Sequence, residues 1–300
     1  MRIAWSESYC HPLPEGHRFP MKKYELIPEQ LLHQGIVQKE QFFQPEEAAL
    51  DDLLLVHSES YVQEVIQLKL DPRAMRKIGF PPSAELVARE REITQGTVHC
   101  ARFALKEGAA MNVAGGTHHA YADHGEGFCI FNDFAVAAAV LLKNKQVNRI
   151  LVVDLDVHQG NGTASIFEKE SSVYTFSMHG KDNYPLHKET SDYDISIATG
   201  TTGDAYLSIL KNKLPEVLDQ SRPDLVFYVS GVDVLEGDKL GKLSLSSEEC
   251  RERDRMVARF FHKKGIPLVA AMGGGYAPEI SRIVDAHCAT FEEIQDAYFD

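Results

Sequence analysis

Three polar side chains of types that bind metals follow one strongly apolar stretch of the sequence, residues 150–153. Such a continuous apolar run is typical of a strand buried on both faces. Because side chains alternate along a strand, Asp154, Asp156 and His158 are expected on one face where the strand ends. Carboxylate and imidazole groups are ligands for zinc and other divalent first-row metals. The pattern predicts a metal site, and the competing interpretation is a solvated strand end.

Two adjacent histidines form a second chemical cluster. His118 and His119 follow a predicted strand at 110–114 and the glycine pair Gly115–Gly116. A histidine pair in a loop is usually solvated, but glycines let the backbone approach a neighbouring group closely. We therefore favour a functional role for this pair. Phe128, a little further on, would by itself more often be a core residue.

Two further predicted strands end in residues that could do chemistry. Asp233 follows the strand at 225–231, and Tyr276 follows the strand at 267–271 and three glycines. Their ordinary interpretations are a turn cap and a core aromatic. However, the carboxyl ends of parallel strands lie along one edge of a sheet, where open α/β sheets keep their sites. Both residues are therefore expected beside the histidine pair and the metal-binding types.

This constellation predicts hydrolysis of an amide. Asp156, His158 and Asp233 would give a metal three ligands and leave positions open, as in catalytic rather than structural sites. A zinc ion polarises a carbonyl and lowers the pKa of bound water toward about 7. A neutral histidine can carry the proton from that water to the leaving amine. The Tyr276 hydroxyl can stabilise the oxyanion.

Predicted helices and strands alternate along the chain, which indicates an α/β fold with a mainly parallel sheet and helices on both faces. There is no internal repeat, low-complexity tract or linker, so one domain is expected over residues 1–300. Helices are predicted at 21–35, 58–70, 83–106, 133–143, 163–168, 204–218, 246–264 and from the glycines at 273–275 to 288, and the other strands at 2–5, 173–178 and 193–198, with loops at 10–20 and 71–82.

The composition is that of an ordinary globular protein, with 44% hydrophobic and 25% charged residues. A net charge of -13 argues against a general binder of nucleic acid or anionic membranes, and it would tolerate a cationic partner such as a lysine-rich peptide or a polyamine. The five cysteines are scattered and contain no C-x-x-C pair, which suits a reducing cytosol. No stretch resembles a signal peptide or a membrane span, so a cytoplasmic location is expected.

Five motifs of this chain resemble those of the histone deacetylase family, in the same order and at similar spacing. They are Gly-Gly-Thr-His-His-Ala at 115–120, Gly-Phe-Cys-Ile-Phe-Asn-Asp at 127–133, Asp-Leu-Asp-Val-His-Gln-Gly-Asn-Gly at 154–162, Ser-Gly-Val-Asp at 230–233 and Gly-Gly-Gly-Tyr at 273–276. The resemblance extends over nearly the whole chain. Residues 232–241 and the compact length look most like the class IV branch and its bacterial relatives.

The resemblance implies the arginase–deacetylase fold, with a central eight-stranded sheet. It also implies a zinc-dependent hydrolase that removes acetyl or longer fatty acyl groups from lysine side chains. Asp156, His158 and Asp233 would be the zinc ligands, and iron(II) could replace zinc in the cell. A structural potassium ion would lie near Asp154, Asp156, His158, Ser177 and Met178, held partly by main-chain carbonyls.

The same resemblance implies catalytic and substrate-binding roles. His118 would hydrogen bond to Asp154 and His119 to Asn161, while Tyr276 would polarise the carbonyl. The walls and rim of a narrow tunnel for the acyl-lysine would be formed by Gly127, Phe128, Tyr184, Leu240 and Gly274.

Three departures from the family pattern bear on function. Many members have an acid where this chain has Asn161, and an amide raises the pKa of His119 less than a carboxylate would. We therefore expect His119 to be neutral and to act as the main proton shuttle. Tyr184 stands where many relatives have phenylalanine, so the acyl-chain preference is open. Apart from Asp71 at its start, segment 71–82 has no obvious acid for the substrate backbone, which predicts weak peptide selectivity.

Other functions compatible with these residues are an acetylpolyamine amidohydrolase, a binuclear manganese ureohydrolase and a catalytically silent acyl-lysine-binding module. Leu240 disfavours the first, because an acid at that position would favour a cationic amine. The aspartates and histidines supply only one full ligand set, which disfavours the second. The complete set of ligands, with His118, His119 and Tyr276, argues against the third.

Overall fold

Eight parallel strands form a single sheet in the computed structural model, which describes residues 1–300. The strand order is β2-β1-β3-β8-β7-β4-β5-β6, and every neighbouring pair is parallel. The predicted α/β class and the eight-stranded sheet are confirmed. The strands are β1 (Arg2–Ala4), β2 (Phe42–Phe43), β3 (Ala109–Asn112), β4 (Ile150–Asp154), β5 (Val173–Gly180), β6 (Tyr193–Ile197), β7 (Leu225–Val229) and β8 (Leu268–Ala271).

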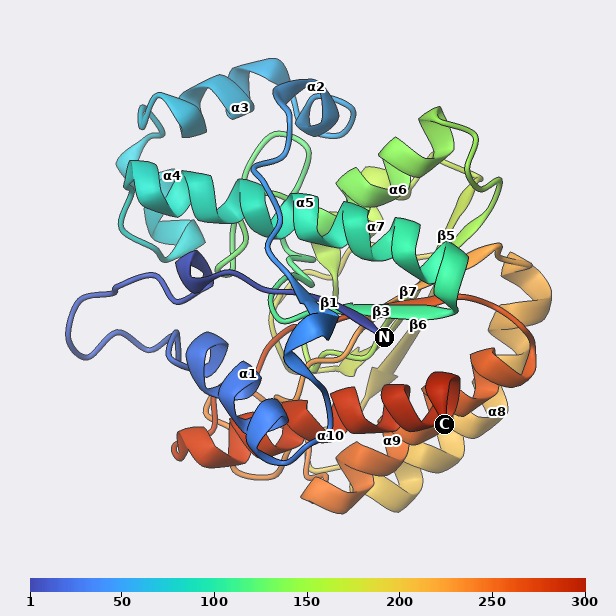
Figure 1. Ribbon diagram of the computed structural model, residues 1–300. Helices are drawn as coiled ribbons and strands as arrows, with labels where there is room; N and C mark the ends of the chain where they lie inside the picture. Colours follow the sequence, from blue (N-terminus) through green and yellow to red (C-terminus); the bar gives the residue numbers. More distant parts are fainter.

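Helices cover both faces of the sheet (Figure 1). Helices α5, α6 and α7 lie on one side, and α1, α8, α9 and α10 lie on the other. The helices are α1 (Lys23–His33), α2 (Leu50–Leu53), α3 (Glu59–Ile66), α4 (Pro72–Ile78), α5 (Ala84–Glu107), α6 (Asp133–Lys143), α7 (Asn161–Phe167), α8 (Gly203–Ser221), α9 (Ser247–Lys263) and α10 (Ile280–Phe299), with short 3-10 turns at Glu7–Tyr9 and Lys39–Gln41. None of these helices has the length and apolar character needed to cross a membrane.

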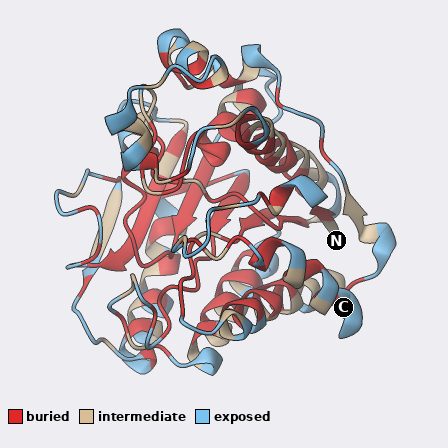
Figure 2. Ribbon diagram, turned by 90° about the vertical axis from the view of Figure 1, so that its left-hand side faces the viewer, coloured by how far each residue is buried: buried red, intermediate tan, exposed pale blue.

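The centre of the sheet is the most buried part of the molecule (Figure 2). Every residue of β4 and β7 is buried, as their continuous apolar sequences predict. The two strands pair in register from Ile150 opposite Leu225 to Asp154 opposite Val229. One continuous cluster of 82 buried hydrophobic residues surrounds them, so the strand ends that carry the polar residues rest on a single rigid core.

The prediction of a loop at 71–82 is wrong, because this segment contains α4. The Asp71 side chain accepts a hydrogen bond from the backbone N–H of Arg73 at 2.7 Å, and Pro72 opens the helix. Gly79 ends it with a φ of 91°, a left-handed conformation that glycine adopts readily. A capping aspartate before a proline is a recognised helix start, and the prolines at 81–82 obscured it.

Other boundaries differ by smaller amounts. Helix α10 continues to Phe299 instead of ending near 288, because its apolar face continues beyond 288 with buried residues such as Phe291 and Ile294, and the helix packs on α9. Helix α3 ends at Ile66, four residues before the expected boundary of 70. The short β2 and α2 were not predicted, since two and four residues give no periodic signal.

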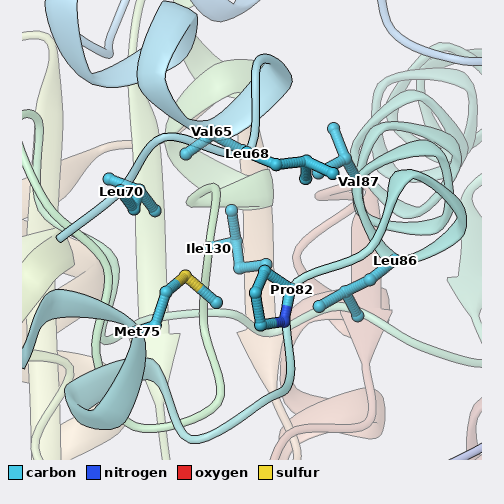
Figure 3. Close-up of a pocket in the computed structure, with 8 residues that line it drawn as sticks. All are labelled: Val65, Leu68, Leu70, Met75, Pro82, Leu86, Val87 and Ile130. Carbon is cyan, nitrogen blue, oxygen red and sulfur yellow. The ribbon is translucent and has the colours of Figure 1, made fainter. Parts of the chain in front are cut away.

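A small apolar pocket lies beside α3, α4 and the start of α5 (Figure 3). Its volume is about 30 Å³, whereas one water molecule needs about 10–15 Å³ on the same measure. It is lined by Val65, Leu68, Leu70, Met75, Pro82, Leu86, Val87 and Ile130. A gap of this size is residual space in the packing of hydrophobic side chains and does not form a second binding site.

Candidate active site

The turn after β4 differs from the predicted strand end. The strand stops at Asp154, so the alternation expected to place residues 154, 156 and 158 on one strand face does not apply beyond it. Instead, the backbone N–H of Asp156 donates to Asp154 Oδ1 at 3.2 Å, and the N–H of His158 donates to Asp156 Oδ1 at 2.9 Å. Such side-chain-to-backbone bonds favour a turn over a strand. They fix the two carboxylates and the imidazole in place.

Asp156, His158 and Asp233 converge into one buried group. Their ligand atoms all lie within 4.8 Å of one another. The Nδ1 atom of His158 is 3.0 Å from Asp156 Oδ1 and 3.1 Å from Asp233 Oδ2. The backbone N–H of Val157 donates to Asp233 Oδ1 at 3.0 Å, and that of Gly274 donates to Asp156 Oδ2 at 2.7 Å. The sequence prediction that these three residues meet is confirmed.

The electrostatics of this group fit a divalent cation. Two carboxylates buried this closely repel each other, and burial with the charge of Asp156 raises the pKa of Asp233 to about 7. A cation between the carboxylates would remove that repulsion. One imidazole nitrogen and carboxylate oxygens are donors that zinc and other divalent first-row metals accept.

The two adjacent histidines lie beside this group in different environments. Their ring centroids are 4.1 Å apart. Burial opposes a charge on His118, but Asp154, whose Oδ2 is 2.6 Å from its Nδ1, raises its pKa to about 9. His119 instead has a neutral partner, Asn161, whose Oδ1 lies 2.6 Å from its Nδ1. Burial and the two neighbouring imidazoles hold the pKa of His119 well below its usual value, so this ring is neutral.

Tyr276 faces the same group from the loop after β8. Its ring centroid is 6.4 Å from that of His158 and 5.9 Å from that of Phe128. The backbone N–H of Tyr276 donates to Asp238 Oδ2 at 2.6 Å. The other Asp238 oxygen accepts from the N–H groups of Leu240, at 2.8 Å, and Gly241. Asp238, which sequence reasoning did not single out, therefore ties the tyrosine loop to the rim.

A cavity of about 460 Å³ leads from the surface to His119, His158 and Tyr276. Four of the five residues that the sequence predicted for the tunnel wall and rim also line this cavity. They are Gly127, Phe128, Tyr184 and Leu240. Gly274 lies deeper, in a small adjoining cavity with Asp156. The Tyr184 ring stands nearly perpendicular to His119, with centroids 5.1 Å apart.

The Phe128 wall is held in a strained backbone conformation. Its φ is 66°, which non-glycine residues rarely adopt. The N–H of Phe128 donates to the Ile78 carbonyl at 2.7 Å, and that of Gly127 donates to the Lys77 carbonyl at 3.0 Å. The end of α4, the segment mistaken for a loop, thus positions one wall of the cavity.

A buried carboxylate that the sequence did not reveal lies behind Asn161. The Asn161 Nδ2 donates to Glu126 Oε1 at 2.7 Å, while its Oδ1 faces His119. Burial, followed by the influence of Glu126, raises the pKa of Tyr184. The amide orientation is therefore fixed from both sides. The only sequence signal was the pair of glycines flanking Glu126.

Lys23 is a second residue that was missed. It lies in the first turn of α1, is fully buried, and donates from Nζ to the Gly273 carbonyl at 3.1 Å. Burial lowers its pKa to about 8, although Asp233 and Asp156 favour the charged form. It supports the glycine loop that precedes Tyr276.

The residues expected around a potassium ion lie at the end of β4, in the turn after it and in the adjacent part of β5. Ser177 is opposite Asp154 in the sheet register, and its Oγ is 2.9 Å from His179 Nδ1. Met178 is fully buried beside it. Asp156 and His158 follow in the turn after β4.

Comparison with known proteins shows the family and the fold of this chain. The histone deacetylase domain family matches residues 17–291. The chain is 43% identical over 296 residues to an uncharacterized protein of Picosynechococcus sp., covering 99% of each. It is 32% identical over 294 residues to histone deacetylase 2 of Arabidopsis thaliana, covering 94% of this chain and 76% of that protein. The crystal structure of a histone deacetylase (HDAC) homolog from Aquifex aeolicus superposes with a TM-score of 0.83 at 23% identity, covering 98% of this chain and 84% of that one, and so has the same fold. This chain belongs to the histone deacetylase family.

Proposed function

We propose that this protein is a zinc-dependent amide hydrolase that removes acetyl or longer acyl groups from lysine side chains. The observation that carries the proposal is the convergence of Asp156, His158 and Asp233 at the inner end of a cavity that also exposes His119 and Tyr276. Bound there, zinc would polarise the amide carbonyl and lower the pKa of a water molecule. Iron(II) would find the same donors.

The two histidines would have different roles, with proton transfer assigned to His119 and stabilisation of negative charge to His118. Because Nδ1 of His119 donates to Asn161, its Nε2 keeps a free lone pair, and the low pKa keeps this ring neutral. Nε2 would accept the proton of the attacking water and return it to the leaving lysine amine. His118, held in its charged form by Asp154, would stabilise negative charge nearby.

Tyr276 would donate its hydroxyl proton in a hydrogen bond to the carbonyl oxygen as that oxygen gains charge. Burial raises the pKa of this phenol well above its usual value, so the hydroxyl stays protonated and can donate. Its backbone bond to Asp238 fixes the loop from which it acts.

The cavity walls suit the methylene chain of lysine. Phe128 is buried and Tyr184 is half-exposed, and both contribute aromatic surface that removes the stem from water. A potassium ion near Asp154, Asp156, His158, Ser177 and Met178 is proposed from the family resemblance and from the placement of these residues at the end of β4, in the turn after it and in the adjacent part of β5.

The test is a series of acyl chain lengths on one lysine peptide, with metal content measured on the same sample. We expect turnover that scales with bound zinc for at least one chain length. Acetylspermidine is the comparison substrate. Cleavage of acetylspermidine alone would replace this proposal with a polyamine amidohydrolase, and peptide binding without cleavage by metal-loaded protein would replace it with a binding module.

A further inference from the structure

Three positively charged side chains surround the mouth of the cavity. Arg18, Lys77 and Lys242 all belong to its lining and are exposed. None of them forms an ion pair with a carboxylate, whereas basic residues elsewhere, such as Arg251 and Arg255, are paired. This concentration of free positive charge is unexpected in a chain with a net charge of -13.

Two of the three cations are attached to the Phe128 wall. Lys77 is in the last turn of α4, and its carbonyl accepts the bond from Gly127 that helps hold Phe128 in place. The Arg18 guanidinium carbon lies 4.9 Å from the centroid of the Phe128 ring, a cation–π contact. These contacts hold both positive charges beside the entrance of the cavity.

Lys242 belongs to the rim that carries Leu240. Its Nζ donates to the Asp182 carbonyl at 2.6 Å. The neighbouring Asn183 donates from Nδ2 to the Leu240 carbonyl at 2.7 Å, which joins this rim to the Tyr184 loop. The positive charges thus come from three separate segments of the chain around one opening.

The two carboxylates in the same lining are engaged in other contacts. Glu126 is only 9% exposed and accepts from Asn161. Asp182 is exposed, and its Oδ2 accepts from Thr199 Oγ1 at 2.8 Å. The lining thus has three cations and two carboxylates, and one of the carboxylates, Glu126, is buried. The mouth is therefore positively charged toward an approaching substrate peptide.

We propose that the mouth selects peptides in which the acyl-lysine is flanked by aspartate or glutamate, and that it disfavours lysine-rich segments and polyamines. This inference rests on the proposed acyl-lysine hydrolase activity. It differs from two expectations from the sequence, a cationic partner and weak peptide selectivity. Because Arg18, Lys77 and Lys242 come from separate segments around one opening, acidic residues on both sides of the acyl-lysine contribute.

The expected effect is moderate and sensitive to salt. One exposed pair of opposite charges changes affinity by about twofold to fivefold. Electrostatic steering adds to the association rate. At 0.1 M salt the screening length is about 10 Å. Attraction between the cations at the mouth and acidic residues of a peptide is therefore effective at low salt and largely screened at salt concentrations well above about 0.1 M.

The experiment compares three peptides that share one acyl-lysine core, which carries the acyl group that is cleaved fastest in the chain-length series. They differ only in their flanking residues, which are aspartate and glutamate, serine and alanine, or lysine. We measure kcat/KM with the metal-loaded full chain at low and high salt. At low salt we expect the acidic peptide to exceed the neutral one, and the neutral one to exceed the basic one, by about threefold to tenfold at each step. At high salt the three values should converge.

The double variant Lys77→Glu with Lys242→Glu should reverse this ranking. Lys106→Glu is the matched control, because Lys106 is exposed at the end of α5, immediately before β3 and thus at the opposite edge of the sheet. The control should keep the wild-type ranking. If the double variant does not fold, the wild-type ranking and its salt dependence still decide the question.

The possible failures are distinguishable. If none of the peptides is cleaved, the proposed hydrolase function fails and the selectivity cannot hold. If all three are cleaved with equal kcat/KM at low salt, the hydrolase stands and the selectivity is overturned. A preference for the basic peptide, or a ranking that the double variant leaves unchanged, also overturns it.

Discussion

The inner end and the mouth of the cavity use charge in opposite ways. At the inner end, Asp156 and Asp233 are at most 1% exposed, and each accepts a backbone N–H. At the mouth, Arg18, Lys77 and Lys242 are exposed and have no ion-pair partner. Buried charges are expensive unless they are compensated, so the inner group is built for a fixed cation. Each exposed charge contributes little to binding energy, so the cations at the mouth can produce moderate differences in affinity between substrates.

The largest effect is expected from Asp233→Asn. This change removes one negative charge and one ligand from the inner group, so the affinity for the metal falls. Loss of a residue that only hydrogen bonds to a metal ligand lowers activity by up to about a hundredfold. Because Asp233 is itself a proposed ligand, we expect its replacement to lower turnover by more than that. Metal content and kcat are measured together, and the control is Asp219→Asn, at an exposed position of α8. Full metal content and activity in Asp233→Asn would contradict the assignment of the inner group.

Tyr276→Phe separates the hydroxyl from the metal site. We expect kcat to fall by about a hundredfold or more, because one oxyanion donor is lost in a site that excludes water. The metal content and KM should change little, since the backbone bond to Asp238 and the ring packing remain. A variant that loses its metal, or one that keeps near-native kcat, would show that the phenol has a different role.

The buried network behind the inner end should make folding sensitive to acid. His57 Nδ1 lies 3.0 Å from the Tyr121 carbonyl, and its Nε2 accepts from the N–H of Asn132, so it supports the loop that carries the histidine pair. Burial lowers the pKa of His57 from 6.5 to about 4. The unfolded chain therefore takes up a proton below pH 6.5 that the folded chain resists until about pH 4.

Stability is thus fully present above pH 6.5 and falls as the pH is lowered toward 4. For His57 alone the loss between pH 7.5 and 5 is about 2 kcal/mol. Chemical denaturation at these two pH values measures it, and His57→Gln, which cannot titrate, should have a smaller pH dependence. Equal pH dependence of the two proteins would rule out His57 as the source.

The smallest effect is expected from Tyr184→Phe, at the boundary between the two regions. The change removes the hydroxyl whose pKa burial and Glu126 raise, and it leaves the ring beside His119. Because this side chain is 39% exposed, we expect KM to rise by only about twofold to fivefold, with kcat nearly unchanged. Steady-state kinetics on one acetyl-lysine peptide measure the change. A large fall in kcat would place Tyr184 with the inner group.

The inner end was more predictable from the sequence than the mouth. Asp156, His158 and Asp233 each follow an apolar strand, and parallel topology brings such ends to one edge. The strand alternation used for residues 154–158 was wrong, but the turn that replaced it kept the residues together. Local hydrogen bonds to carboxylates decide that geometry, and they leave little trace in the spacing.

Residues whose roles depend on tertiary contacts could not be identified from the sequence. Lys23 reads as an ordinary lysine in a helix, yet tertiary packing buries it. Glu126 becomes informative only when Asn161 is seen to bond to it. Arg18 and Lys77 lie 59 positions apart in the sequence, and only the packing of Phe128 brings them together.

The central claim is that one divalent cation, held by Asp156, His158 and Asp233, is required for hydrolysis of an acyl-lysine. The most direct measurement is turnover of an acyl-lysine peptide as zinc is added back to chelator-treated protein. We predict no turnover without metal and a linear rise that saturates at one equivalent per chain. Undiminished turnover in protein verified to be free of metal would contradict the claim.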